Sequence, residues 1–363
     1  MLISTYKMEI IKNYLKYSLW LVLIVFAALF GLHWLPAITI DGHTMRRVDL
    51  LSDLRYPKQE VAVADSDTIP LPPVVKPVFV DTCRAGMTCI EDYGDSTRRG
   101  MASFYEALDR TSSSHPDHDG LVRIAVFGDS FIEADIFTAD LREMLQKRFG
   151  GCGVGFVTIT SMTSGYRPTV RHTFGGWSSH AVTDSVYFDK KKQGISGHYF
   201  IPREGAYVEL RGQSKYASLL DTCQQASIFF YNKDSVHLTA RVNRGESKNY
   251  SLAPSGDLQK ISVEGRIGSV RWTVDRADST LFYGLAMDGK KGIILDNFSL
   301  RGSSGLSLRG IPQQMLRQFN EQRPYDLIIL EYGLNVATER GRNYDNYQKG
   351  LLTSCLLYTS PSP

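Results

Sequence analysis

Ser130 has the surroundings that a nucleophilic serine requires. It ends the sequence Gly128-Asp129-Ser130, which directly follows the apolar run Ile124–Phe127. Because that run is apolar throughout, it predicts a strand buried on both faces of a sheet. Apolar residues at helical spacing follow over residues 136–149, so Ser130 is expected at a strand-to-helix turn. A serine there would have its hydroxyl in solvent and a helix N-terminus favouring developing negative charge, which indicates nucleophilic chemistry.

The same tripeptide occurs a second time, at Gly94-Asp95-Ser96. This copy follows Glu91-Asp92-Tyr93 instead of an apolar run, and a helical pattern follows it over residues 101–110. Asp95 or Ser96 is therefore expected to cap a helix. Only the copy that contains Ser130 has the context of a catalytic site.

Two other predicted strands end in residues that suit the same chemistry. Gly302 follows the predicted strand 293–299, and Asn335 follows the apolar strand predicted over residues 325–330. A glycine lets a backbone N–H approach a substrate oxygen without steric hindrance, and an asparagine offers a side-chain amide. Because three predicted strands end in this way, we expect a nucleophile and two donors at one sheet edge, which is the arrangement of an oxyanion hole.

These motifs resemble the blocks of the SGNH (GDSL-type) hydrolase family. Gly128-Asp129-Ser130 matches the first block, and Gly302, in Asn297-Phe-Ser-Leu-Arg-Gly302, is the expected match to the second. Gly333-Leu334-Asn335 matches the third block, except that Val336 replaces its aspartate. The resemblance implies a flavodoxin-like three-layer α/β/α domain, formed by residues 81–168 and 292–353.

The resemblance also implies roles for these residues. Ser130 would attack an acyl carbonyl, and Ser130, Gly302 and Asn335 would hold the oxyanion. A histidine oriented by an aspartate would act as general base, and the family places both in an Asp-x-x-His block after the third block. This sequence contains no such block. All eight histidines precede the third block, and His172 and His180 are weak candidates for a general base that lines a cleft.

The C-terminal residues suggest why the Asp-x-x-His block is absent. Residues 355–363, Cys-Leu-Leu-Tyr-Thr-Ser-Pro-Ser-Pro, interrupt a helical pattern and resemble the translation of a sequencing adapter. We expect residues 354–363 to be a non-native tail, with the catalytic histidine encoded further downstream, and we expect little or no hydrolysis by this chain. A genuine short tail is the alternative.

Between the two α/β segments, residues 169–291 have the pattern of an all-β unit. Short alternating segments recur with turn residues between them, and no long helical pattern occurs. This predicts an inserted β-sandwich of the jelly-roll kind. The long gap between the first two blocks is similar to that of bacterial peptidoglycan and polysaccharide O-acetylesterases, whose inserted β-sandwich resembles a carbohydrate-binding module.

The N-terminus predicts a membrane anchor. Residues 17–36 are almost wholly apolar and follow three lysines within residues 1–16, so they are expected to cross the inner membrane with residues 1–16 cytoplasmic. The rest of the chain would then be periplasmic. A cleaved signal peptide and a buried core helix are the alternatives. Residues 37–80 contain the Pro-rich stretch 56–77 and are expected to be an extended tether.

Composition excludes several other classes. The net charge of +3 and the lack of a basic cluster with interleaved aromatics give no indication of a nucleic-acid partner. No Cys/His spacing resembles a zinc site and no phosphate-binding loop occurs, so no metal or cofactor is expected. Cys83 and Cys89 enclose a short loop and are a candidate disulfide in an oxidising compartment, whereas Cys152 and Cys223 cannot be paired from sequence.

The sequence therefore predicts a membrane-anchored serine esterase that acts on O-acyl esters, chiefly O-acetyl esters, of peptidoglycan or another polysaccharide. Two alternatives stay open. A polysaccharide O-acetyltransferase would use the same residues with a sugar hydroxyl in place of water. A non-catalytic glycan-binding protein would use the β insertion instead.

Overall fold

The computed structural model describes residues 16–28, 30–31, 39–40, 43–44, 100–111, 120–184, 188–338 and 343–359. The chain divides into two units, Met1–Ala85 and Gly86–Pro363. In the first unit, residues 16–28 and 30–31 are helical, and β1 (Thr39–Ile40) pairs with β2 (His43–Thr44). None of the helices in the described ranges is both long and apolar enough to cross a bilayer. The predicted Cys83–Cys89 disulfide and the second Gly-Asp-Ser sequence lie outside the described residues.

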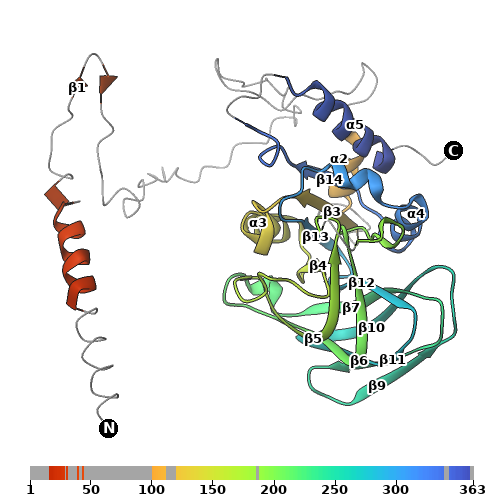
Figure 1. Ribbon diagram of the computed structural model, residues 1–363. Coiled ribbons are helices and arrows are strands. Elements are labelled where there is room, and N and C mark those ends of the chain that lie inside the picture. The colour runs from red at the N-terminus through yellow and green to blue at the C-terminus, as the bar shows by residue number, and fades with distance from the viewer. Residues whose placement is uncertain are drawn as a thin grey trace, which may run out of the picture. The chain divides into compact units, whose positions relative to one another are not determined.

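The second unit contains a parallel α/β sheet whose central strand precedes Ser130. The central strand β3 (Leu121–Gly128) pairs in parallel with β13 (Gly292–Ser299) on one side and β14 (Leu327–Glu331) on the other. In Figure 1 these strands lie above the antiparallel sheet, with helices to either side. The predicted parallel α/β sheet is therefore confirmed.

Helices cover both faces of this sheet because alternate residues of β3 face opposite sides. Val122, Ile124 and Val126 pack with α2 (Ala102–Asp109) and α3 (Thr138–Phe149). Ala125 and Phe127 face the other side, toward α4 (Gln313–Gln322). The last helix is α5 (Asp345–Thr359). The described residues also include short 3-10 helices: η2 (Glu133–Asp135), η3 (Lys190–Lys192), η4 (Ser218–Leu220) and η5 (Leu306–Gly310).

The remaining strands form one nine-stranded antiparallel sheet that curls into a sandwich. Its strands are β4 (Gly155–Val157), β5 (Val170–Ala181), β6 (His198–Gly212), β7 (Cys223–Asn232), β8 (Val236–Val242), β9 (Ser247–Leu252), β10 (Leu258–Ile267), β11 (Ser269–Ala277) and β12 (Thr280–Asp288). The order is β10-β7-β12-β6-β11-β8-β9, with β4 beside β12 and β5 beside β6. Trp272, Phe230 and Phe282 are fully buried in the core that the curled sheet encloses.

Strand β4 belongs to the antiparallel sheet although it precedes residue 169. Phe156 and Val157 pair with Ala286 and Leu285 of β12. The antiparallel sheet therefore includes one strand from the segment of the chain before residue 169.

A buried ion cluster joins the two sheets. The guanidinium of Arg323, just after α4, donates to Asp288 of β12 at 2.5 and 2.9 Å and to Asp296 of β13 at 2.5 and 2.7 Å. Asp296 also accepts hydrogen bonds from the Phe156 N–H (2.8 Å) and the Tyr325 hydroxyl. Buried charges are tolerated only when they are paired. Because Arg323 pairs with a carboxylate of each sheet, separating the two sheets would leave buried charges unpaired.

Candidate active site

The three predicted site residues follow strands that end at the same level of the parallel sheet. Gly128, the last residue of β3, lies directly opposite Ser299 of β13 and Glu331 of β14. The Leu300 N–H then donates to the Gly128 carbonyl at 2.9 Å. The segments that contain Ser130, Gly302 and Asn335 therefore leave the sheet at one carboxyl edge, where parallel sheets bind ligands.

Close packing explains the glycine before Ser130. A Cβ at position 128 would lie 2.9 Å from Oε2 of Glu331 and 2.9 Å from the side chain of Ile132. Real Cβ atoms do not approach other atoms this closely, so the side chains of Glu331 and Ile132 would have to shift to admit any other residue at position 128.

Ser130 is partly exposed, in a turn directly after the buried Asp129. No hydrogen bond of the described residues uses the Ser130 hydroxyl, so its lone pairs are free to attack a ligand. The helix expected over residues 136–149 is present as α3, which begins at Thr138. Ala134 and Asp135 have φ values of 56° and 62°, so the segment between Ser130 and α3 is irregular.

Asp135 holds this irregular segment in place. Its carboxylate is completely buried and accepts hydrogen bonds from Arg142 (3.3 Å) and Arg167 (2.8 and 3.1 Å). Further donors are the side chains of Thr138, Thr169 and Asn297. Burial alone would raise the pKa of Asp135, but the two arginine charges outweigh it and hold the pKa well below its usual range. The turn after Ser130 is thereby tied to the start of β5 through residues 167–169.

Gly302 lies in an exposed turn after β13. Its φ of 73° is in the left-handed region, which favours glycine, and no atom lies within 4 Å of the place where a Cβ would be. The backbone conformation therefore favours glycine here, and the space beside it is open. The neighbouring Arg301 forms an ion pair with Glu133 at 2.5 Å, which links this turn to the segment after Ser130.

Asn335 contacts the first block directly. Its amide nitrogen donates to Oδ2 of Asp129 at 2.8 Å and to the carbonyl oxygen of Ser303 at 3.0 Å. Asp129 is fully buried, and its other oxygen accepts from the Phe131 N–H at 2.9 Å. The Asn335 amide therefore joins all three strand ends, and both of its hydrogens are engaged in the structure without a ligand.

Two carboxylates at this edge were not among the predicted site residues. Asp129 orients Asn335, and its position directly after an apolar strand was the available signal. Glu331 ends β14, and its Oε2 is buried without a hydrogen-bond partner among the described residues. Burial, followed by the charge of Asp129, raises the pKa of Glu331. Strand-end position identifies both residues, whereas their contacts appear only in three dimensions.

The histidines whose side chains the structure describes lie in the β region. His172 is buried beside Ile159 and lines a pocket, while His180 stacks on Tyr199. His198 hydrogen-bonds to the carbonyl oxygen of Ser196, and His237 contacts Ser251. In this part of the chain no imidazole is hydrogen-bonded to Ser130, so a general base for Ser130 is not assigned.

A pocket of about 340 Å³ lies beside the strand ends. The segment after Ser130 contributes Glu133 and Ala134, and the end of β13 contributes Ser299, Leu300 and Arg301. The β region supplies its opposite wall, which is rich in hydroxyl groups: Thr158, Thr160, Ser161, Thr163, Ser179 and Thr183. Hydroxyl groups both donate and accept hydrogen bonds, so this strand-end pocket suits a ligand that is itself rich in hydroxyls.

Comparison with known proteins identifies a similar fold. Neither a family model nor a curated protein matches the sequence. A solved structure of a peptidoglycan O-acetylesterase is similar over 74% of this chain and 70% of its own, with 19% sequence identity and a TM-score of 0.56.

Two further structures give weaker matches. A mutant of a family 29 carbohydrate-binding module matches 38% of this chain and 93% of its own, with 12% identity and a TM-score of 0.23. An exo-β-1,3-galactanase from Phanerochaete chrysosporium matches 37% of this chain and 29% of its own, with 13% identity and a TM-score of 0.24. Over most of its length, then, this chain is similar in fold to a peptidoglycan O-acetylesterase.

Proposed function

We propose that this protein is a serine esterase that removes O-acyl groups, chiefly O-acetyl groups, from a cell-wall or other polysaccharide. The observation that carries the proposal is the alignment of Gly128, Ser299 and Glu331 at one sheet edge. Because the three strands end together, the segments that contain Ser130, Gly302 and Asn335 begin at one edge of the sheet, which supports a shared site. The similarity in fold to a peptidoglycan O-acetylesterase supports the same chemistry.

In the proposed reaction, Oγ of Ser130 attacks the acyl carbonyl and transfers its proton to a general base. The backbone N–H groups of Ser130 and Gly302 and the amide of Asn335 stabilise the oxyanion. The acyl–oxygen bond to the sugar then breaks, and the sugar oxygen takes the proton from the base and leaves as a hydroxyl. Water then attacks the acyl-serine, which releases the carboxylic acid and restores Ser130. The strand-end pocket would bind the sugar rings through its hydroxyl groups.

The Asn335 amide has to exchange one hydrogen bond to take part. Its bond to Asp129 has a charged acceptor and is therefore the stronger of the two. We propose that the bond to the neutral carbonyl of Ser303 is the one that the oxyanion replaces. Asp129 would then keep the amide aimed at the developing charge throughout the reaction.

The general base is the part of the proposal that rests on the family resemblance, which assigns it to an Asp-x-x-His block absent from this sequence. Imidazole in solution can substitute for a missing histidine. The test is acetate release from an O-acetylated xylan by this chain with and without added imidazole. We expect release that rises with imidazole and is lost in Ser130→Ala, while the control Ser218→Ala, an exposed serine outside the strand-end pocket, behaves as wild type. Equal release by Ser130→Ala and wild type would refute the assignment.

A non-catalytic glycan-binding role is the second candidate. It is favoured by the engaged Asn335 amide and by the lack of a histidine at Ser130 among the described residues. In that case the protein binds the O-acetylated xylan, and imidazole produces no Ser130-dependent acetate release. Transfer to a glycan acceptor in place of water would appear as an acetylated acceptor in the same reaction.

We further propose that residues 17–36 anchor the protein in the inner membrane, with the esterase domain in the periplasm. The long apolar run and the lysines before it support this orientation. Protease added outside spheroplasts should then cleave the esterase domain. Protection until the membrane is lysed would contradict the orientation.

A further inference from the structure

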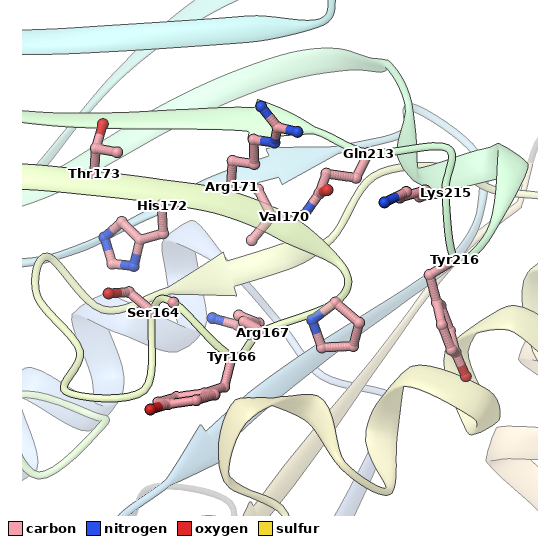
Figure 2. A pocket seen from close by; sticks show the side chains of 12 residues that line it. Ser164, Tyr166, Arg167, Val170, Arg171, His172, Thr173, Gln213, Lys215 and Tyr216 are labelled. Carbon is pink, nitrogen blue, oxygen red and sulfur yellow. The ribbon is translucent and has the colours of Figure 1, made fainter. Parts of the chain in front are cut away.

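A second and larger pocket, of about 700 Å³, lies at the start of strand β5. Its walls are the loop 164–168, the first residues of β5 and the segment that follows β6. In Figure 2, Tyr166 and Tyr216 lie at opposite ends of this pocket, with Arg167 between them. Arg167 also lines the strand-end pocket, so the two pockets are neighbours along one side of the β region.

The larger pocket is positively charged. Arg171 and Lys215 line it and form no ion pair within the described part of the chain, and none of its lining residues is acidic. Arg167 is paired with Asp135, but that single carboxylate is shared with Arg142, so the trio keeps one net positive charge. His172 adds no charge at neutral pH, because burial and the charge of Arg167 lower its pKa to about 4.

The strand register places another positive charge beside the pocket. Arg171 of β5 lies directly opposite Arg211 of β6. Like charges at opposed positions of an antiparallel pair destabilise it. Glu209 forms ion pairs with both Arg211 and Arg271, at 3.4 Å each. Its single negative charge therefore does not neutralise Arg171 and Arg211. A bound anion would relieve this repulsion.

The pocket also presents aromatic surface. Tyr166 is 84% exposed. Exposed tyrosine rings offer an apolar face together with a polar hydroxyl, and an open pocket that combines them with unpaired cations suits a sugar that carries a negative charge. A small inorganic anion would use the cations and leave the rings unoccupied.

We propose that this pocket binds an anionic residue of a polysaccharide, and we call it the anionic-sugar pocket. Its unpaired cations are Arg171 and Lys215, and its aromatic walls are Tyr166 and Tyr216. This inference rests on the proposed esterase function and narrows its substrate to an acidic glycan. A chain that occupied both pockets would place an acyl group near Ser130 and a charged group between Tyr166 and Tyr216.

The experiment measures binding by the full chain carrying Ser130→Ala, so that no substrate is consumed. The probes are oligogalacturonate, which carries carboxylates, a phosphorylated mannan, and neutral dextran of similar length. We expect the chain to bind one or both charged glycans more tightly than dextran, and the difference between them identifies the anion. Binding should weaken as salt is added.

The key variant is Arg171→Glu/Lys215→Glu. It should weaken binding of the charged glycan by about tenfold or more. The control Arg203→Glu/Lys233→Glu changes the net charge equally at exposed positions outside both pockets, and it should bind as the parent does. If the double charge reversal impairs folding, Arg171→Gln/Lys215→Gln replaces it, because this variant removes the charges without introducing repulsion. Its loss of binding should be intermediate.

Equal binding of dextran and the charged glycans, or equal losses in the pocket and control variants, would overturn the inference. These outcomes are separate from the fate of the proposed function. Ser130-dependent acetate release without selective glycan binding would leave the esterase assignment in place. Selective binding without such release would leave the anionic-sugar pocket and remove the esterase.

Discussion

The buried carboxylate of Asp135 permits a quantitative prediction about stability. In Asp135→Asn, the chain loses the one negative charge shared by Arg142 and Arg167. The side chains of Asp135 and Arg142 are completely buried, and that of Arg167 is 9% exposed. Removing one partner from a buried ion pair typically costs about 3–5 kcal/mol, because the remaining charge is left without compensation.

The structure places the expected loss within that range. An asparagine keeps one oxygen acceptor, but its NH2 group would face donors that now point at the other carboxylate oxygen, including Nε of Arg167. Arg142 keeps two hydrogen bonds to the Leu295 carbonyl, at 3.1 Å each, which limits the penalty. We therefore expect Asp135→Asn to lower the free energy of unfolding by about 3–5 kcal/mol.

Urea-induced unfolding followed by tryptophan fluorescence measures this loss. The control is Glu264→Gln, which breaks the exposed ion pair with Lys290 and should leave the transition close to that of wild type. A pH series adds an independent test. Because the pKa of Asp135 is lowered in the folded state, its contribution is present above the unfolded pKa of about 4 and is lost as pH falls through the folded pKa. A loss below about 1 kcal/mol at neutral pH would refute the view that Asp135 compensates two buried charges.

Three further predictions follow from local environments. His172 has a folded pKa of about 4, below its unfolded value of about 6.5, so acidification from pH 7 to 4 should remove about 3 kcal/mol of stability. That part of the pH dependence should be absent in His172→Gln, and an unchanged slope would contradict it. Gly284→Ala would place a Cβ 2.1 Å from the ring of Phe156 and should cost about 1–3 kcal/mol by overpacking. Gly256→Ala, in open space, is the control, and equal denaturation midpoints for the two variants would argue against the clash. Burial raises the pKa of the Cys223 thiol, so iodoacetamide should label it only after unfolding, whereas rapid labelling of the native chain would show that it is accessible.

The elements that form the candidate site could be predicted because their sequence patterns are local. The strands β3, β13 and β14 contain apolar stretches of strand length, and α3 has apolar residues at helical spacing. The contact between Asn335 and Asp129 could not be predicted, because these residues lie far apart in the chain and their pairing depends on the strand register.

The sequences of two strands in the antiparallel sheet lack the regular alternation of a predicted strand, for different physical reasons. Strand β9, with the sequence SKNYSL, is mostly exposed and lies at the sheet edge, so burial imposes no apolar alternation on it. Strand β5 alternates at its start but then contains Gly175 and Gly176, where the register shifts. A glycine pair normally signals a turn, whereas here it marks a bulge within a strand.

The position of β3 between β13 and β14 has a consequence for how the chain folds. Asn297 of β13 hydrogen-bonds to the Ile132 carbonyl although 165 residues separate them along the chain. Closing so long a loop costs chain entropy before any contact compensates for it, and such non-local pairing is slow. Hairpin neighbours within the curled sheet, such as β8 and β9, close much shorter loops. We therefore expect the antiparallel sheet to form first and to bring β3 and β13 together, so that in pulsed hydrogen exchange the amides of β8 and β9 gain protection before those of β3. The site at Ser130 would then form last, after the antiparallel sheet has folded.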